Sequence, residues 1–175
     1  ASMEKILDQV AVAENGDRLG RLLYQGRERA DYSLDRESQA VRSAWDLREG
    51  LAELAAFAQQ QKARLERAIG DRAAALGLGA TQPVAPPRNP EAEKIVVRRK
   101  RSGTITLDDL PREQRENYPA ASFWGAPVSA LYWCDGKRNL AEVIRLTELE
   151  MGPQQFDFVG YFRFLEKRGY VEFVR

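Results

Sequence analysis

Histidine is absent from this chain of 175 residues, and cysteine occurs once, at Cys134. Histidine is the side chain most often used as a general base and as a metal ligand, so its absence excludes Ser-His and Cys-His nucleophile pairs and histidine-bound zinc. A single cysteine cannot form an internal disulfide, which is typical of proteins in a reducing compartment such as the cytoplasm. We therefore expect no catalytic centre, no metal and no cofactor in this chain.

Long hydrophobic runs and an excess of one charge are also lacking. No apolar run approaches the ~18 residues from which a membrane-spanning helix is predicted, and no signal peptide is recognisable. The net charge is +1, so overall charge does not attract the chain to nucleic acid or to an anionic membrane. With 43% hydrophobic and 30% charged residues, the composition is that of a globular protein with a buried core.

Apolar residues at spacings of three and four predict long helices in the first 76 residues. The first helix covers about residues 3–30, and the turn signal at residues 15–17 leaves open a division into two shorter helices. A break near residues 31–33 separates it from a second helix over about residues 34–76, in which Gly50 and Gly70 are expected sites of bending or ending. The apolar stripe of this second helix would be buried in a hairpin with the first helix, in a coiled coil with another copy, or against a neighbouring domain.

A segment rich in proline and glycine follows, from Gly77 to Pro90. Its four prolines and two glycines cannot continue a helix, so the sequence predicts a linker over residues 77–93 between domains at residues 1–76 and 94–175. Beyond the linker, the β-prone runs 94–97 and 104–107 flank a basic turn that contains glycine. This pattern predicts a β-hairpin.

Residues 127–175 carry the clearest start and stop signals. Pro127 is suited to the first turn of a helix that ends at Asp135-Gly136, and Asn139 with Glu142 forms a capping box for the next helix. Gly152-Pro153 ends that helix, and a third helix is expected from about residue 154 to 168. A final strand over residues 170–174 would pair with run 104–107 or with Lys137-Arg138. This order predicts a small winged helix-turn-helix.

Three segments of this region, residues 130–143, 158–162 and 169–172, resemble the winged-helix-like tail of some bacterial zinc aminopeptidases. They are also similar, more loosely, to the peptide-binding modules of modified-peptide biosynthesis. The resemblance covers roughly the last 50 residues. Those peptidases hold their metal ligands in a separate α/β domain that this chain does not contain, so the resemblance implies an accessory, non-catalytic part.

The complete prediction is a mainly α protein, with a long helical hairpin or coiled coil followed by a small winged helix-turn-helix-like α+β domain. Its third C-terminal helix is apolar nearly all round, and we expect one side of it to meet the N-terminal helices or another subunit. We predict a protein-interaction or assembly module that forms a homodimer. The candidate interface residues are Trp45, Leu51, Phe158, Tyr161 and Phe164.

Nucleic-acid binding by a winged-helix regulator is the alternative prediction, based on the cluster Arg98, Arg99, Lys100 and Arg101. The same cluster would also suit a solvated hairpin tip whose charges oppose aggregation. Cys134 is expected to be a buried structural thiol, because no histidine can activate it. The neighbouring acids at Asp108-Asp109 and at Glu148 and Glu150 are expected to be helix caps and solvated charges.

Overall fold

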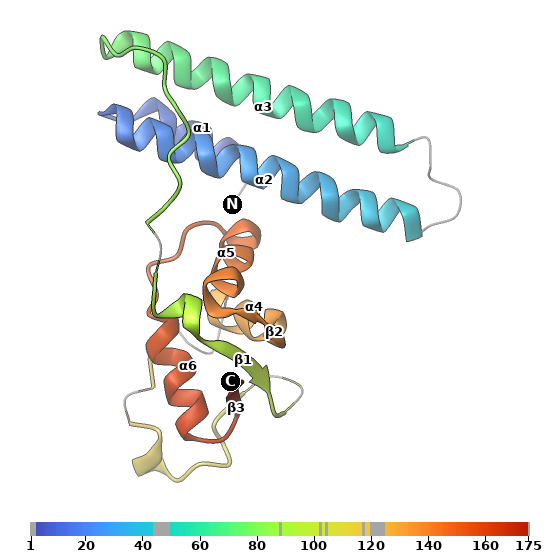
Figure 1. Cartoon of the computed structure of the whole chain (residues 1–175), viewed down its shortest axis with the longest axis vertical. Coiled ribbons are helices and arrows are strands. Elements are labelled where there is room, and N and C mark those ends of the chain that lie inside the picture. Colours follow the sequence, from blue (N-terminus) through green and yellow to red (C-terminus); the bar gives the residue numbers. More distant parts are fainter. Residues whose placement is uncertain are drawn as a thin grey trace. The chain divides into compact units, whose positions relative to one another are not determined.

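The computed structural model describes residues 3–43, 50–87, 89–101, 103, 105–116, 118–119 and 125–174. The chain divides into two compact units, residues 1–87 and 88–175, and each is described by itself. The described residues form six α-helices and one small antiparallel sheet of three strands (Figure 1). The prediction of a mainly α protein is therefore confirmed.

The first unit contains α1 (Met3–Ala11), α2 (Gly16–Ser43) and α3 (Gly50–Ala75). Helices α2 and α3 lie side by side and run in opposite directions (Figure 1). The division that the turn signal at residues 15–17 left open is present, with α1 ending at Ala11 and α2 beginning at Gly16. Asn15 Oδ1 caps α2 by accepting a hydrogen bond from Arg18 N at 2.9 Å. No helix in the described residues combines the length and the apolar character needed to cross a membrane.

The predicted helix over residues 34–76 is not continuous, and the expected site of interruption at Gly50 is the start of α3. The expected break at residues 31–33 lies inside α2, which ends at Ser43, and α3 begins at Gly50. Residues 31–33 contain no glycine or proline, and their polar side chains are compatible with a solvated face of a continuous helix.

The core of the first unit lies where α1 packs against the hairpin. It is built from Ile6 and Val10 of α1, Leu19 and Leu22 of α2, and Leu65, Ile69 and Ala73 of α3. Arg64 Nη1 donates to Glu4 Oε1 at 2.6 Å, and Arg72 Nε donates to Ala13 O at 2.8 Å. Helix α1 therefore lies against the C-terminal half of α3.

Two glycines of α2 serve as points of close contact. The segment after α3 crosses α2 at Gly20, where Val84 N donates to Gly20 O at 2.9 Å. A Cβ on Gly20 would lie 2.6 Å from Gln82 O, and a Cβ on Gly26 would collide with the Leu65 side chain of α3. The absence of a side chain at these glycines allows neighbouring segments to pack closely against α2. This packing offsets their low helix propensity, and α2 continues through both positions.

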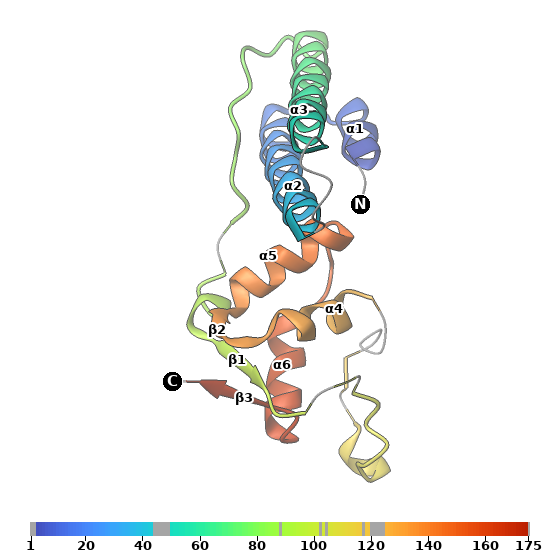
Figure 2. The same cartoon turned by 90° about the vertical axis from the view of Figure 1, so that its right-hand side faces the viewer.

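The second unit is organised around a sheet with strand order β2-β1-β3 (Figure 2). Strand β1 is antiparallel to both neighbours. The elements, in chain order, are the short 3₁₀ helix η1 (Ala92–Lys94), β1 (Val96–Arg99), the short 3₁₀ helix η2 (Arg112–Gln114), α4 (Ala126–Trp133), β2 (Asp135–Asn139), α5 (Leu140–Met151), α6 (Phe158–Lys167) and β3 (Val171–Val174).

The predicted hairpin between runs 94–97 and 104–107 is wrong. Strand β1 pairs with β2 and β3, and residues 105–107 form no strand, while Thr104 lies outside the described residues. Ile105 and Leu107 are instead buried in the core of the unit. The final strand likewise pairs with β1 alone, and with neither predicted partner, because β1 occupies the centre of the sheet.

Helix boundaries in this unit follow the local capping signals. Asn139 caps α5 by accepting from Glu142 N at 2.9 Å, and α5 ends at Met151 with Gly152 as its C-cap, where the stop was predicted. Helix α6 begins at Phe158 rather than at residue 154, because Asp157 caps it by accepting from Gly160 N at 2.9 Å. Helix α4 ends at Trp133, before the predicted Asp135-Gly136 stop, and these two residues open β2.

The glycines give a first test of this packing. We expect Gly26→Ala to destabilise the first unit by about 1–3 kcal/mol, because its methyl group would enter the space of Leu65. Gly70→Ala is the matched control in α3, since its Cβ would meet no atom within 4 Å. It should stabilise the protein by up to about 1 kcal/mol through helix propensity. Urea unfolding followed by circular dichroism measures both, and equal effects would contradict the close contact at Gly26.

Candidate functional site

The basic cluster at residues 98–101 lies on and just after β1, and its arginines bind within the second unit. Arg98 Nη1 donates to Glu172 Oε1 of β3 at 3.1 Å, and Arg99 Nη2 donates to Gly103 O at 2.7 Å. Arg101 pairs with Asp109. Lys100 has no side-chain partner among the described residues. Two of the four charges of the cluster are therefore paired with carboxylates of the same chain, and a third, Arg99, is hydrogen-bonded to a neutral carbonyl.

Two of these arginines also stack on aromatic rings. The guanidinium carbon of Arg99 lies 5.1 Å from the ring centroid of Tyr132, and that of Arg101 lies 5.2 Å from the centroid of Tyr170. Tyr170 also donates its hydroxyl to Asp109 Oδ1. This hydrogen bond, together with Arg101, holds the pKa of Asp109 below its usual value. The cluster thus connects β1 and the start of β3 to the loop at Asp109.

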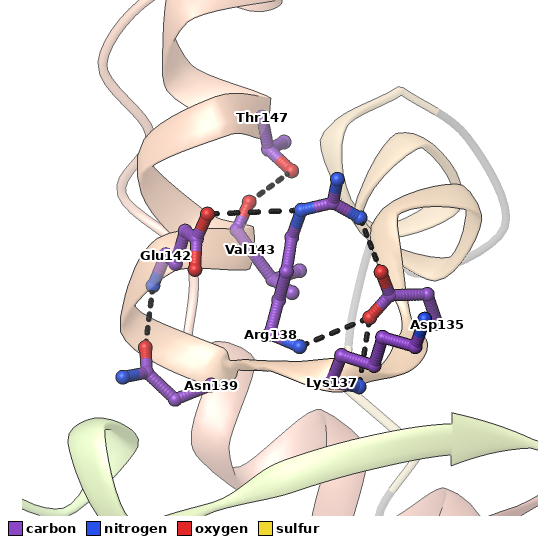
Figure 3. A network of polar contacts seen from close by, with 7 residues as sticks. All are labelled: Asp135, Lys137, Arg138, Asn139, Glu142, Val143 and Thr147. Atoms are coloured by element: carbon purple, nitrogen blue, oxygen red, sulfur yellow. Dashed lines mark hydrogen bonds and ion pairs between the residues drawn. The ribbon is translucent and has the colours of Figure 1, made fainter.

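The connection from α4 to α5 is held by a polar network (Figure 3). Asp135 Oδ1 accepts from Lys137 N at 2.8 Å and from Arg138 N at 2.9 Å, and Arg138 Nη1 donates to Asp135 Oδ2 at 2.6 Å. The hydrogen bonds from the two backbone N–H groups lower the pKa of Asp135. Arg138 also lies over the ring of Trp133, 5.5 Å from its centroid, and pairs with Glu142.

The same network explains the residue pattern on which the resemblance to peptidase tails depends. Gly136 has φ +77°, and a Cβ there would lie 2.7 Å from Arg98 Nε, so glycine fits both the backbone and the crossing of β1. Asp135, Arg138 and Asn139 bind the turn and the start of α5. In this chain the pattern therefore has a structural role.

Cys134 is buried and 5% exposed, as predicted. Its Sγ donates to Ala130 O of the preceding helical turn at 3.3 Å. Burial raises the pKa of this thiol to about 12, so the reactive thiolate is scarce at neutral pH.

The neighbouring acidic residues are engaged separately. Asp109 bonds Tyr170 and Arg101, as described above, whereas Glu148 Oε1 accepts from Gln154 N at 3.2 Å and Glu150 Oε2 accepts from Ser129 Oγ at 2.9 Å. Across the described ranges, no three Asp, Glu or Cys side chains converge in a group that could hold a metal ion. Each of these carboxylates thus binds a different neighbour, and the two acidic pairs do not form one site.

The structure describes four of the five predicted interface residues. Trp45 lies outside the described residues, and Leu51 is half-buried on α3. Phe158 and Tyr161 are 4% and 0% exposed inside the core of the second unit, so their expected role on the surface does not hold. Phe164 is half-buried, with its ring 5.1 Å from that of Tyr118 and under the guanidinium of Arg168.

The expectation that these aromatic residues form an interface was wrong because side chains from other segments of the second unit bury them. The sequence near α6 does not reveal these contacts. Tyr118, Ile105 and Leu107, all from the irregular stretch before α4, pack with the α6 side chains. Phe156, just before α6, contacts both Phe158 and Tyr161 edge-on, with centroid distances of 5.0 and 5.6 Å. The irregular stretch before α4 and the residues just before α6 thus help to enclose the apolar side chains of α6.

A surface that the sequence prediction missed lies on the N-terminal half of α3. Phe57 is 59% exposed there, on a part of the helix that α1 does not cover. Residues 50–61 contain one charged side chain, Glu53, whereas residues 62–72 contain six. The abrupt loss of charge along the helix was the available signal, and we call residues 50–61 the α3 face.

The C-terminal half of α3 borders a hollow of about 500 Å³ in the first unit. Its lining includes Leu23, Ile69 and Ala73 and the segment 78–81. The two charged residues of the lining pair with each other, since Arg27 Nη2 donates to Glu66 Oε1 at 2.6 Å. The remainder of the lining is mainly apolar side chains and backbone groups.

Comparison of this chain with protein-family models, curated proteins and solved structures gives no match.

The cap of α5 can be tested directly. We expect Asn139→Ala to destabilise the second unit by about 1 kcal/mol, because Glu142 N loses its acceptor at the start of the helix. Asn139→Asp keeps a side-chain acceptor at the same position and should unfold close to the wild type. Urea unfolding measures the difference, and identical midpoints for all three proteins would show that the cap contributes nothing.

Cys134 gives a pH prediction. A thiol with a folded pKa of about 12 and an ordinary value of 9.0 remains protonated in the folded chain while the unfolded chain ionises. Stability should therefore fall as pH rises from about 9 to about 12. Cys134→Ala removes this contribution, so the difference between the two unfolding free energies should change over that interval. A thiol reagent that labels the folded chain as fast as the unfolded chain at pH 8 would contradict the burial.

Proposed function

We propose that this chain is a non-catalytic protein-interaction and assembly module whose helical unit associates with a second copy through the α3 face. The observation that carries the proposal is the exposure of Phe57 on a helix surface with a single charge. Exposed apolar surface with few charges is characteristic of the centre of protein interfaces.

The composition of the exposed positions supports this assignment. Around Phe57, the exposed residues of the α3 face are Ala52, Glu53, Ala55, Ala56, Gln59 and Gln60. The next two turns instead carry exposed ionic pairs, such as Arg64 with Glu4 and Arg27 with Glu66. The surface of α3 is therefore charged over residues 62–72, where it pairs with α1 and α2, and nearly uncharged over the α3 face.

The packing of the hairpin gives a second argument. The buried cluster of the first unit contains residues of α3 from Leu65 onward and none from the α3 face. Leu51 and Leu54 of this face are half-buried against the remainder of the unit. A neighbouring helix would cover this end as α1 covers the other, and burying Phe57 would contribute about 1.5–3 kcal/mol.

A second copy is a suitable neighbour because a twofold interface brings the same surface together twice. The α3 face contributes only Glu53 as a charge, so pairing it with itself brings few like charges together. Leu51, a predicted interface residue, belongs to this face. Trp45 precedes it in the sequence.

An accessory role beside a zinc aminopeptidase, in the cytoplasm, is part of the same proposal and follows from the resemblance of the last 50 residues. The sequence encoded next to this chain tests it. A neighbouring zinc-peptidase domain with its own histidine ligands would support the accessory role, and an unrelated neighbour would contradict it.

Nucleic-acid binding remains the alternative prediction. The internal partners of Arg98, Arg99 and Arg101 weaken it, because contact with phosphates would have to replace hydrogen bonds already made in the chain. An electrophoretic shift at low salt that disappears when residues 98–101 are neutralised would favour this alternative.

Sedimentation equilibrium tests the assembly. The wild-type chain should show a concentration-dependent dimer, and Phe57→Lys should weaken it by at least about tenfold, because a charge would be buried where a ring was. Ala75→Lys is the matched control, since it adds the same charge at an exposed position of α3 outside the α3 face. A wild-type chain that remains a monomer at every concentration would refute the self-association.

A crosslinking measurement identifies the surface. Cys134 is buried, so a cysteine introduced at Ala56 or Ala75 is the reactive thiol of the variant. Mild oxidation should join two Ala56→Cys chains, because the α3 faces lie against each other, and should leave Ala75→Cys chains separate. The reverse pattern would place the contact elsewhere on the helical unit.

A further inference from the structure

Strand β3 is an edge of the sheet in the second unit, with β1 on one side (Figure 2). The opposite edge, β2, has two backbone N–H groups that already donate to Asp135 Oδ1, those of Lys137 and Arg138. No comparable side-chain acceptor reaches β3 from the described residues. The two edges therefore differ in the backbone groups that they offer.

The register shows which groups of β3 are open. Lys100 N donates to Tyr170 O at 3.1 Å, and the ladder continues with Arg98 opposite Glu172 and Val96 opposite Val174. Hydrogen-bonded pairs alternate along an antiparallel ladder, so the N–H and C=O groups of Val171 and Phe173 point away from β1. Within the described residues no backbone hydrogen bond reaches these four groups.

The side chains beside this edge divide between two faces. Val171 is 2% exposed and Phe173 is half-buried, and both pack on the core side of the sheet. Glu172 lies on the opposite face, where it pairs with Arg98 of β1. An added strand would thus find apolar surface on the core side and an acidic side chain on the outer side.

We propose that the β3 edge binds an extended segment of a partner polypeptide by adding it to the sheet as a fourth strand. The four open backbone groups provide the hydrogen bonds, and Phe173 receives an apolar side chain from the segment. Glu172 favours a lysine or arginine directly opposite it. The segment therefore has a basic residue flanked by two apolar residues.

A second copy of β3 fits this edge poorly. Twofold antiparallel pairing that uses all four groups places Val171 opposite the partner's Phe173, and it places Glu172 opposite its own counterpart. Two carboxylates directly across a ladder repel each other. The occupant is therefore a different polypeptide, and this site is separate from the α3 face of the proposed function.

Three labelled peptides with the core Val-Lys-Val, Val-Glu-Val and N-methylated Val-Lys-Val test the proposal on the full chain by fluorescence anisotropy. The first should bind, the acidic peptide about tenfold more weakly, and the N-methylated peptide at least about tenfold more weakly because its backbone donors are removed. Amide exchange should slow at Val171 and Phe173 when the first peptide binds, and remain unchanged at Lys137.

Variants of the edge complete the test. Glu172→Lys should reverse the preference between the lysine and glutamate peptides, and Glu172→Gln should abolish it. Phe173→Pro removes one open N–H and should bind at least about tenfold more weakly than Phe173→Ala, which lacks the ring but keeps that donor. If the proline variant does not fold, the N-methylated peptide tests the same bond on the unaltered protein.

Several results would overturn the proposal. The first is that neither the lysine peptide nor the glutamate peptide binds at about 1 mM. The second is that the N-methylated peptide binds as tightly as the unmethylated lysine peptide. The third is that Glu172→Lys keeps the wild-type preference for the lysine peptide over the glutamate peptide. Protection of the Phe173 amide that rises with protein concentration in the absence of peptide would identify a second copy as the occupant. None of these results depends on whether the helical unit forms a dimer.

Discussion

The hydrogen bonds of β1 to both of its neighbours are the constraint on which the C-terminal unit depends. The strand lies before α4 in the chain, whereas β2 and β3 follow α4 and α6. Without β1 those two strands would have no partner, because they do not pair with each other. The helices after Ala126 are therefore not a complete fold by themselves. Residues 96–99 join the two ends of the unit.

This dependence explains how much of the fold could be predicted. Pro127 marks the start of α4 through its fixed φ, and Asn139 and Gly152 mark the ends of α5 through hydrogen bonds within a few residues. The structure has those boundaries in place. The pairing of β1 with β3 joins residues more than 70 positions apart, as in Arg98 with Glu172, and no local pattern specifies it. The shorter separation of runs 94–97 and 104–107 favoured a hairpin, but burial of Ile105 and Leu107 in the core competes with that pairing.

The candidate sites show the same division between local and distant information. A run of four basic residues suggests an exposed patch, yet Glu172 and the Tyr132 ring, both distant in sequence, and Asp109, eight positions after Arg101, bind its arginines. The aromatic residues of α6 suggested a surface, yet Tyr118 and Phe156 help to enclose them. Phe57 was overlooked because an apolar stripe along a helix predicts which residues are buried. It gives little information about an apolar residue on the exposed side of the helix.

The two proposed surfaces differ in chemistry, and that difference keeps them separate. Beyond its first turn, the α3 face offers side chains and no open backbone groups, because a helix satisfies its own hydrogen bonds there. Its side chains carry a single charge, so it is suited to another apolar helix. The β3 edge offers backbone groups and an acidic side chain, so it is suited to an extended basic segment. A dimer formed through the first surface would carry two copies of the second. A partner with two such segments would then bind more tightly than a partner with one, because its second contact forms within the same complex.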